Sequence, residues 1–175
     1  SKNADERREV ASITKLMTAL LVLEALDRDE IALTDSVQIS PRAAAMKGSQ
    51  ALLDASAVYP LEDLLRTTIM ASANDSAVAL SEYIAGSEEN FVDRMNRRAA
   101  ELGMTNTNYV NCTGYPQSGQ YTTARDVCRL CCEIAKHPRY NQYASVWIDK
   151  LTHPGGRVTD LTNTNRLVRF YEGCD

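Results

Sequence analysis

The longest apolar segment of the chain covers residues 12–27, where hydrophobic side chains occupy almost every helical face. A helix that is apolar nearly all round is normally buried on all sides. We therefore predict a central, buried helix over this segment. Lys15 and Glu24 interrupt the apolar run. No stretch of about 18 apolar residues occurs anywhere in the chain, so we predict no transmembrane helix.

Further helices follow from start and stop signals. Pro60 suits the first turn of a helix that continues to about Ala71. A second helix over residues 75–85 should end at Gly86. Ser87 caps a third helix. The apolar face of that third helix consists of Val92, Met95, Ala99 and Leu102.

In the rest of the chain we predict one helix, a pair of short strands and irregular segments. Thr123-x-x-Asp126 resembles a capping box before a helix that ends near His137. Residues 146–151 and 157–161 are typical of two strands joined by a hairpin turn. Irregular or extended chain is expected over residues 35–54, with extended pieces at 37–39 and 51–53, and over residues 105–112. No linker or second domain boundary is visible, so we predict a single domain.

The composition is that of an ordinary soluble domain. Of the 175 residues, 44% are hydrophobic and 24% are charged, and the net charge is −4, which suits a chain that buries one core. The densest basic cluster is Arg94, Arg97 and Arg98 on a predicted helix. We interpret it as a solvated helix face and expect no nucleic-acid partner.

Five cysteines occur, at positions 112, 128, 131, 132 and 174. An odd number cannot close as a set of intramolecular disulfides, and the redox state stays open. Cys128, Cys131 and Cys132 share one helical face, and we expect them to be small buried core residues. A metal site is the weaker alternative, because no second Cys or His pair lies at ligand spacing.

Histidine-dependent chemistry is poorly supported. The two histidines, His137 and His153, each precede a proline, and no Gly-x-Ser-x-Gly segment is present, which argues against a Ser-His-Asp hydrolase. The sequence also lacks a His-Glu-x-x-His helix and a phosphate-binding glycine loop. An enzyme built on this chain would therefore work without histidine, and we predict no metal or other cofactor.

Ser12-Ile13-Thr14-Lys15 is the first candidate for chemistry. At a helix start, Ser-x-x-Lys places a hydroxyl and an amine one turn apart on the same face, and Thr18 extends this polar stripe. Lys15 could reach the surface with its charged end. Alternatively, burial and the helix N-terminus could favour a neutral amine that takes the proton of the Ser12 hydroxyl. The motif alone is common and does not decide between these interpretations.

Ser72-Ala73-Asn74 is the second candidate. It lies at the junction of two predicted helices, so one hydroxyl and one amide should share a tight loop. Such a pair could relay a proton to a leaving group and bind a substrate amide. The competing interpretation is an ordinary helix cap formed by Ser72 or Asn74.

Several segments together resemble the D-alanyl-D-alanine carboxypeptidases, which are the low-molecular-mass penicillin-binding proteins. The first two are Ala11 with the Ser-Ile-Thr-Lys-Leu-Met-Thr-Ala run from Ser12, and Ser-Ala-Asn-Asp-Ser-Ala from Ser72. The other matching segments, in order, are residues 101–107, 109–111 with Gly114, 121–126 and 163–167. The resemblance covers nearly the whole chain and is far more specific than either short motif.

The resemblance implies a role for each polar residue. Ser12 would attack the peptide carbonyl between two D-alanines and form an acyl-enzyme, with Lys15 as general base. Ser72 would pass the proton to the departing D-alanine, and Asn74 would position Lys15 and the substrate amide. The partners implied are peptidoglycan stem peptides ending in D-Ala-D-Ala, and β-lactam antibiotics such as penicillin, which would acylate Ser12.

The implied fold is α+β, a helical lobe on a five-stranded antiparallel sheet. This chain should supply mainly the helical lobe and a small β-hairpin, as a single partial catalytic domain over residues 1–175. The N-terminal strands and the Lys-Thr-Gly strand of the family do not occur in it, and both ends look cut. In the family, the Lys-Thr-Gly strand binds the terminal carboxylate of the substrate and completes the oxyanion hole. We therefore expect little activity from the chain alone. The full-length protein is expected to be extracytoplasmic and membrane-associated, and this chain to be soluble.

Two alternatives stay open. A class A β-lactamase shares the Ser-x-x-Lys and Ser-x-Asn motifs, but it would also need a Glu-x-x-Leu-Asn segment, which does not occur here. A non-catalytic module with the same fold could bind peptidoglycan or a partner. The presence of all four polar residues argues against a decayed site.

Overall fold

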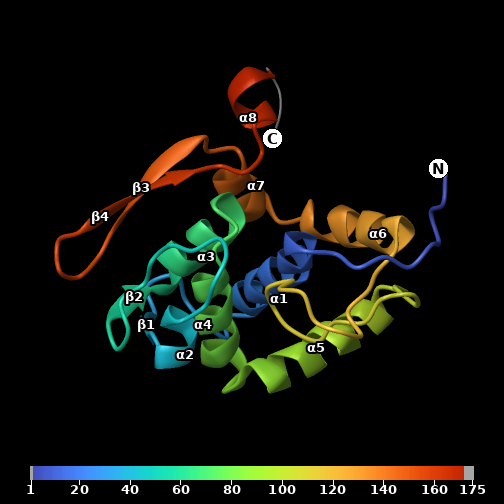
Figure 1. Ribbon diagram of the computed structural model, residues 1–175, viewed down its shortest axis with the longest axis horizontal. Helices are drawn as coiled ribbons and strands as arrows, with labels where there is room; N and C mark the ends of the chain where they lie inside the picture. The colour runs from blue at the N-terminus through green and yellow to red at the C-terminus, as the bar shows by residue number, and fades with distance from the viewer. Residues whose placement is uncertain (1, 172–175) are drawn as a thin grey trace.

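The computed structural model describes residues 2–171. Its helices are η1 (Ser12–Thr14), α1 (Lys15–Asp27), α2 (Pro41–Ala44), α3 (Leu61–Met70), α4 (Asn74–Ala85), α5 (Glu88–Glu101), α6 (Ala124–Ile134), α7 (Pro138–Ala144) and α8 (Leu167–Phe170). Its strands are β1 (Ser36–Gln38), β2 (Val58–Pro60), β3 (Ile148–Thr152) and β4 (Val158–Thr162). The predicted helical lobe with a small hairpin is therefore confirmed (Figure 1).

Helix α1 runs through the middle of the molecule, with α3, α4, α5, α6 and α7 packed around it (Figure 1). Met17, Leu20 and Leu23 are at most 1% exposed, as expected for a helix that is apolar nearly all round. The first turn is the tighter η1, so the α-helix proper begins at Lys15. None of the helices in the described part of the chain is long and apolar enough to cross a membrane.

Two antiparallel pairs of strands are present within residues 2–171. β3 pairs with β4 as the predicted hairpin, with Lys150 opposite Asp160. β1 overlaps the predicted extended piece at residues 37–39, and it pairs with β2, which the hydrophobic pattern did not indicate. The predicted extended piece at residues 51–53 is not a strand. The carboxylate of Asp75 accepts the Ala51 and Leu53 N–H groups, at 2.9 and 3.1 Å. These backbone donors therefore have hydrogen-bond partners without pairing to another strand.

Several helix boundaries agree with the capping signals, although Pro60 is the last residue of β2 and the cap residue before α3 rather than part of its first turn. Gly86 closes α4 in the left-handed conformation, with a φ of 78°, and the Ser87 hydroxyl accepts the Asn90 N–H at the start of α5. Thr123 caps α6 in the same way. However, α6 ends at Ile134, and Pro138 then starts the separate helix α7 as its first residue, a position that proline favours.

The expectation of buried cysteines on α6 is wrong. Leu130 and Ile134 form the buried face of this helix, whereas Cys128, Cys131 and Cys132 are exposed. The three thiols do share a face, but it lies roughly opposite the one that packs on the core. Cys112 is buried. Cys174 and the other residues of the predicted cut end, Gly173 and Asp175, lie outside the described residues.

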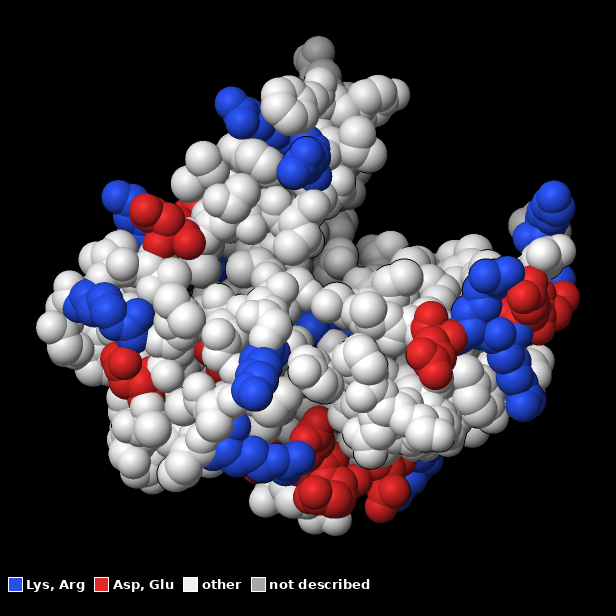
Figure 2. All heavy atoms as spheres, viewed as in Figure 1, with Lys and Arg blue, Asp and Glu red and all other residues white. Residues whose placement is uncertain are grey.

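Charged side chains are spread over the surface. Figure 2 shows basic and acidic residues interspersed on one face rather than gathered in a single patch. Arg98, predicted to lie on a solvated face, is only partly exposed and pairs with Glu24, Glu101 and Glu133. This part of α5 is therefore neutralised by acidic groups from α1 and α6 and from α5 itself.

Candidate active site

The turn from η1 into α1 brings a hydroxyl and an amine together. Lys15 Nζ lies 3.1 Å from Ser12 Oγ and donates to it. Lys15 is only 4% exposed, although its side chain carries an ionisable group. The alternative in which its amine reaches the surface is therefore wrong, and the amine is directed at Ser12.

Burial sets the protonation of this amine. Desolvation lowers the pKa of Lys15 from 10.5 to about 8, against the opposing effects of Cys112 and Asp75. A buried ammonium loses hydration that the apolar surroundings do not replace. At a pH near 8 the amine is therefore partly neutral, and only the neutral form can accept the proton of a serine hydroxyl.

A second polar contact holds Lys15 from the opposite side. Its Nζ donates to the Thr113 carbonyl oxygen at 2.7 Å. One turn along α1, the Thr18 hydroxyl donates to the Cys112 carbonyl oxygen, also at 2.7 Å. The polar stripe predicted on α1 thus binds two consecutive carbonyl groups of one loop, which sequence reasoning did not find.

The loop that carries these carbonyls is folded by Asn111. Its side-chain oxygen accepts the N–H groups of Thr113 and Gly114, at 3.2 and 2.7 Å, and its amide donates to the Tyr115 carbonyl at 2.9 Å. An asparagine that binds backbone two or three residues ahead stabilises a tight turn. Asn111 and Gly114 were part of the family resemblance, and this turn gives them a structural role.

Gly114 lies directly against the chain that precedes Ser12. Its φ is +80°, and a Cβ at this position would lie 1.9 Å from the Ala11 carbonyl oxygen. We expect Gly114→Ala to lower the free energy of unfolding by about 2–4 kcal/mol, because it adds both backbone strain and a backbone clash. Urea denaturation followed by circular dichroism measures the change.

Gly155→Ala is the matched control, because nothing lies within 4 Å of its added Cβ. An exposed substitution of this kind should change stability by no more than about 0.5 kcal/mol. Equal stability of the two variants would contradict the close packing of Gly114 on Ala11.

Ser72 has two unusual properties. Its φ is +56°, in the left-handed region that side chains with a Cβ rarely adopt, at a cost of about 1–3 kcal/mol. Its hydroxyl oxygen is buried and forms no hydrogen bond with the described residues. Strain and an unpaired buried polar atom are each expected at functional sites.

Ser12, Lys15 and Ser72 line the same cavity, of about 270 Å³, whose apolar side includes Leu16 and Ile69. Three of the four predicted site residues therefore meet in one concave space. The buried Cys112 thiol is not a competing nucleophile, because desolvation raises its pKa well above the usual value and a protonated thiol reacts poorly.

Asn74 is placed differently. Its amide donates to the Lys47 carbonyl at 2.6 Å and its backbone N–H to the Ser49 carbonyl at 2.7 Å, so it ties α4 to the neighbouring loop. No hydrogen bond joins Asn74 to Lys15 among residues 2–171. The helix-cap interpretation of Ser72 and Asn74 is wrong, because Ala73 occupies the cap position and no side chain caps α4.

The arrangement defines a class. The helical lobe, the hairpin and the contact between Ser12 and Lys15 agree with what the resemblance to the low-molecular-mass penicillin-binding proteins implies. The chain belongs to the Peptidase_S11 family of D-alanyl-D-alanine carboxypeptidases, whose family model matches residues 1–174. The family resemblance and the predicted fold class are both confirmed.

Similar proteins support this assignment. D-alanyl-D-alanine carboxypeptidase DacF of Bacillus subtilis is 41% identical over 175 residues, which is 100% of this chain and 45% of that protein. DacC of Escherichia coli is 41% identical over 135 residues, or 73% of this chain and 34% of that protein. The chain thus spans less than half the length of these curated relatives.

Solved structures share the fold. The carboxypeptidase DacD of Francisella tularensis superposes with a TM-score of 0.93 at 26% identity, over 98% of this chain and 53% of that one. Penicillin binding protein 5 of Haemophilus influenzae gives a TM-score of 0.88 at 32% identity, over 96% of this chain and 48% of that one. These matches confirm the α+β architecture.

Proposed function

We propose that this chain carries the nucleophile and the base of a serine-type D-Ala-D-Ala carboxypeptidase that trims peptidoglycan stem peptides. The observation that carries the proposal is the buried Lys15 amine, which lies 3.1 Å from Ser12 Oγ and has a pKa lowered to about 8. Family membership supplies the substrate class. The assignment of the four site residues is part of the same proposal.

In the proposed mechanism, neutral Lys15 takes the proton of the Ser12 hydroxyl as Ser12 Oγ attacks the carbonyl between the two D-alanines. The tetrahedral intermediate collapses to an acyl-enzyme when the nitrogen of the terminal D-alanine receives a proton through Ser72. The unpaired, buried Ser72 hydroxyl in the shared cavity is suited to this relay. Water then releases the shortened peptide. Asn74, at the start of α4, would position the substrate amide, and would position Lys15 only indirectly, because its own amide donates to the Lys47 carbonyl.

We further propose that residues 1–175 form part of one catalytic domain. The Lys-Thr-Gly strand and the N-terminal strands would belong to the part of the relatives' length that this chain does not span. Losing an oxyanion-hole donor typically costs on the order of 10²–10³ in rate, so the 175 residues alone should have little activity. The complete protein would act outside the cytoplasm, in association with the membrane, and would bind β-lactams.

Release of D-alanine tests the proposal. The complete protein that contains this chain should liberate the terminal D-alanine from a synthetic stem peptide that ends in D-Ala-D-Ala, and should liberate no terminal L-alanine from the same peptide ending in D-Ala-L-Ala. Fast turnover of a β-lactam without D-alanine release would favour a class A β-lactamase instead. Binding of peptidoglycan without either reaction would favour a non-catalytic module.

The lowered pKa of Lys15 predicts how the rate depends on pH. With a pKa of about 8, roughly a tenth of the amine is neutral at pH 7 and roughly nine tenths at pH 9. The rate of penicillin acylation should therefore rise about tenfold per pH unit below pH 8 and level off above it. Stopped-flow measurements between pH 6 and 9.5 would show this, and a flat profile would contradict Lys15 as the base.

A further inference from the structure

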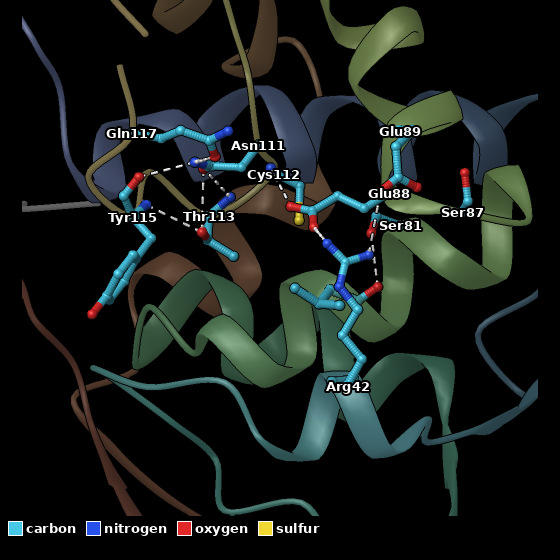
Figure 3. Close-up of polar contacts among 12 residues, drawn as sticks. Arg42, Ser81, Ser87, Glu88, Glu89, Asn111, Cys112, Thr113, Tyr115 and Gln117 are labelled. Carbon is cyan, nitrogen blue, oxygen red and sulfur yellow. Dashed lines mark hydrogen bonds and ion pairs between the residues drawn. The ribbon is translucent and has the colours of Figure 1, made fainter. Parts of the chain in front are cut away.

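Glu88 is a buried carboxylate in a part of the molecule that the proposed mechanism does not use. It is the first residue of α5 and only 6% exposed. Its Oε1 accepts the Cys112 N–H at 2.9 Å, and its Oε2 accepts from Arg42 Nη2. Figure 3 shows this carboxylate between the Arg42 guanidinium and the loop that contains Asn111, Cys112 and Thr113.

The same loop is bound to α1 from its other side. The Cys112 carbonyl accepts from Thr18, and the Thr113 carbonyl accepts from Lys15, each at 2.7 Å. One peptide segment thus donates the Cys112 N–H to the Glu88 carboxylate and, one residue later, accepts the Lys15 amine at the Thr113 carbonyl. Glu88 and the Lys15 amine therefore each bind this segment.

The buried position of Glu88 is costly and needs a reason. A carboxylate removed from water must be compensated by hydrogen bonds, and a well-packed apolar residue is often at least as stabilising. The compensating Arg42 side chain is itself half-exposed, so its attraction is partly screened by solvent. Without Glu88, the buried Cys112 N–H would have no acceptor.

We propose that Glu88 is a positioning residue for Lys15, because its carboxylate fixes the Cys112 N–H and thereby the Thr113 carbonyl that orients the amine toward Ser12. The kinetic part of this inference rests on the proposed acylation of Ser12, whereas the position of the amine can be measured without it. Glu88 touches neither Ser12 nor the cavity, so it acts only through the loop.

Penicillin acylation kinetics of the complete protein test the inference. In Glu88→Ala, we expect the acylation rate constant to fall about 10- to 100-fold, because small misplacements of a catalytic group have effects of this size. The noncovalent dissociation constant should not change. Glu88→Gln retains an oxygen for the Cys112 N–H and should recover most of the rate, although it lacks the charge that pairs with Arg42.

Glu89→Ala is the matched control, since Glu89 is the next residue of α5 and its side chain is 76% exposed. It should behave like the wild type. Wild-type acylation by a folded Glu88→Ala variant would overturn the inference, and so would equal losses in the Ala and Gln variants. If thermal melting shows that Glu88→Ala does not fold, Glu88→Asp decides: its shorter side chain should slow acylation, and an unchanged rate would overturn the inference.

A second readout does not depend on activity. The ¹³Cε chemical shift of Lys15 reports its titration, and the ionisable groups that act on this amine are Cys112 and Asp75. Loss of the Thr113 acceptor destabilises the ammonium form, so the Lys15 pKa should fall further in Glu88→Ala than in Glu88→Gln. The same titration in all three proteins would overturn the inference. If the wild type is not acylated at all, the proposed function fails, and this titration still decides the role of Glu88.

Discussion

Replacing Ser12 by alanine is expected to abolish covalent labelling of the complete protein by a fluorescent penicillin. The substitution removes the oxygen that lies 3.1 Å from Lys15 Nζ in the shared cavity. Because Cys112 is held protonated by burial, no thiolate can take its place. Loss of a catalytic nucleophile lowers rates by at least on the order of 10⁴, so labelling within minutes should disappear.

The matched control is Ser36→Ala, which removes an exposed hydroxyl from strand β1. It should be labelled like the wild type. Labelling of Ser12→Ala at the wild-type rate would exclude Ser12 as the nucleophile. Circular dichroism of both variants separates a chemical loss from a folding loss.

Replacing Lys15 by methionine is expected to have the second-largest effect. Methionine fills a similar volume but cannot accept the Ser12 proton, and general base catalysis typically contributes on the order of 10²–10⁴ in rate. The acylation rate should fall by this factor, and the rise in rate toward pH 8 should disappear with the titrating group. Stopped-flow acylation across the same pH range measures both consequences.

Lys136→Met is the comparison for this variant, because Lys136 is exposed on the surface and pairs with Glu133. It should leave the rate and the pH profile unchanged. A Lys15→Met variant that kept the wild-type pH profile would show that another group sets the rate.

The elements that the sequence predicts correctly are those determined by residues close together in the chain. The all-round apolar pattern of residues 12–27 defined the central helix, and Gly86 marked the end of α4 through its backbone freedom. The spacing of Ser12 and Lys15 was enough to predict that they share one face of a helical turn, but not that the amine is buried and directed at the hydroxyl. These inferences need only the geometry of a single element.

Contacts between distant segments could not be predicted in the same way. The Thr113 carbonyl on Lys15, the Asp75 carboxylate on residues 51–53 and the Glu88 carboxylate on Cys112 each join residues 22 to 98 positions apart. The periodicity of hydrophobic residues along the chain does not indicate which distant residues are in contact. The exposed thiols of α6 could not be predicted for a related reason. Their spacing shows that they share a helical face, but not whether that face packs on the core or lies in solvent.

Ser72 shows where a structure was required to choose between interpretations. A serine before a helix is more often a cap than a catalytic group. The structure excludes the cap, and the positive φ and unpaired hydroxyl of Ser72 support the proposed catalytic role. Neither property can be read from residue types, because both arise from how α3 ends and α4 begins.

Peptide-mapping mass spectrometry of the complete protein after reaction with benzylpenicillin tests the central claim most directly. Trypsin cleaves after Arg8 and Lys15, and the released peptide of residues 9–15 contains two hydroxyl side chains, Ser12 and Thr14. One intact penicillin is expected on this peptide, with fragmentation placing it on Ser12. An adduct on any other residue would contradict the account, and so would the absence of any adduct.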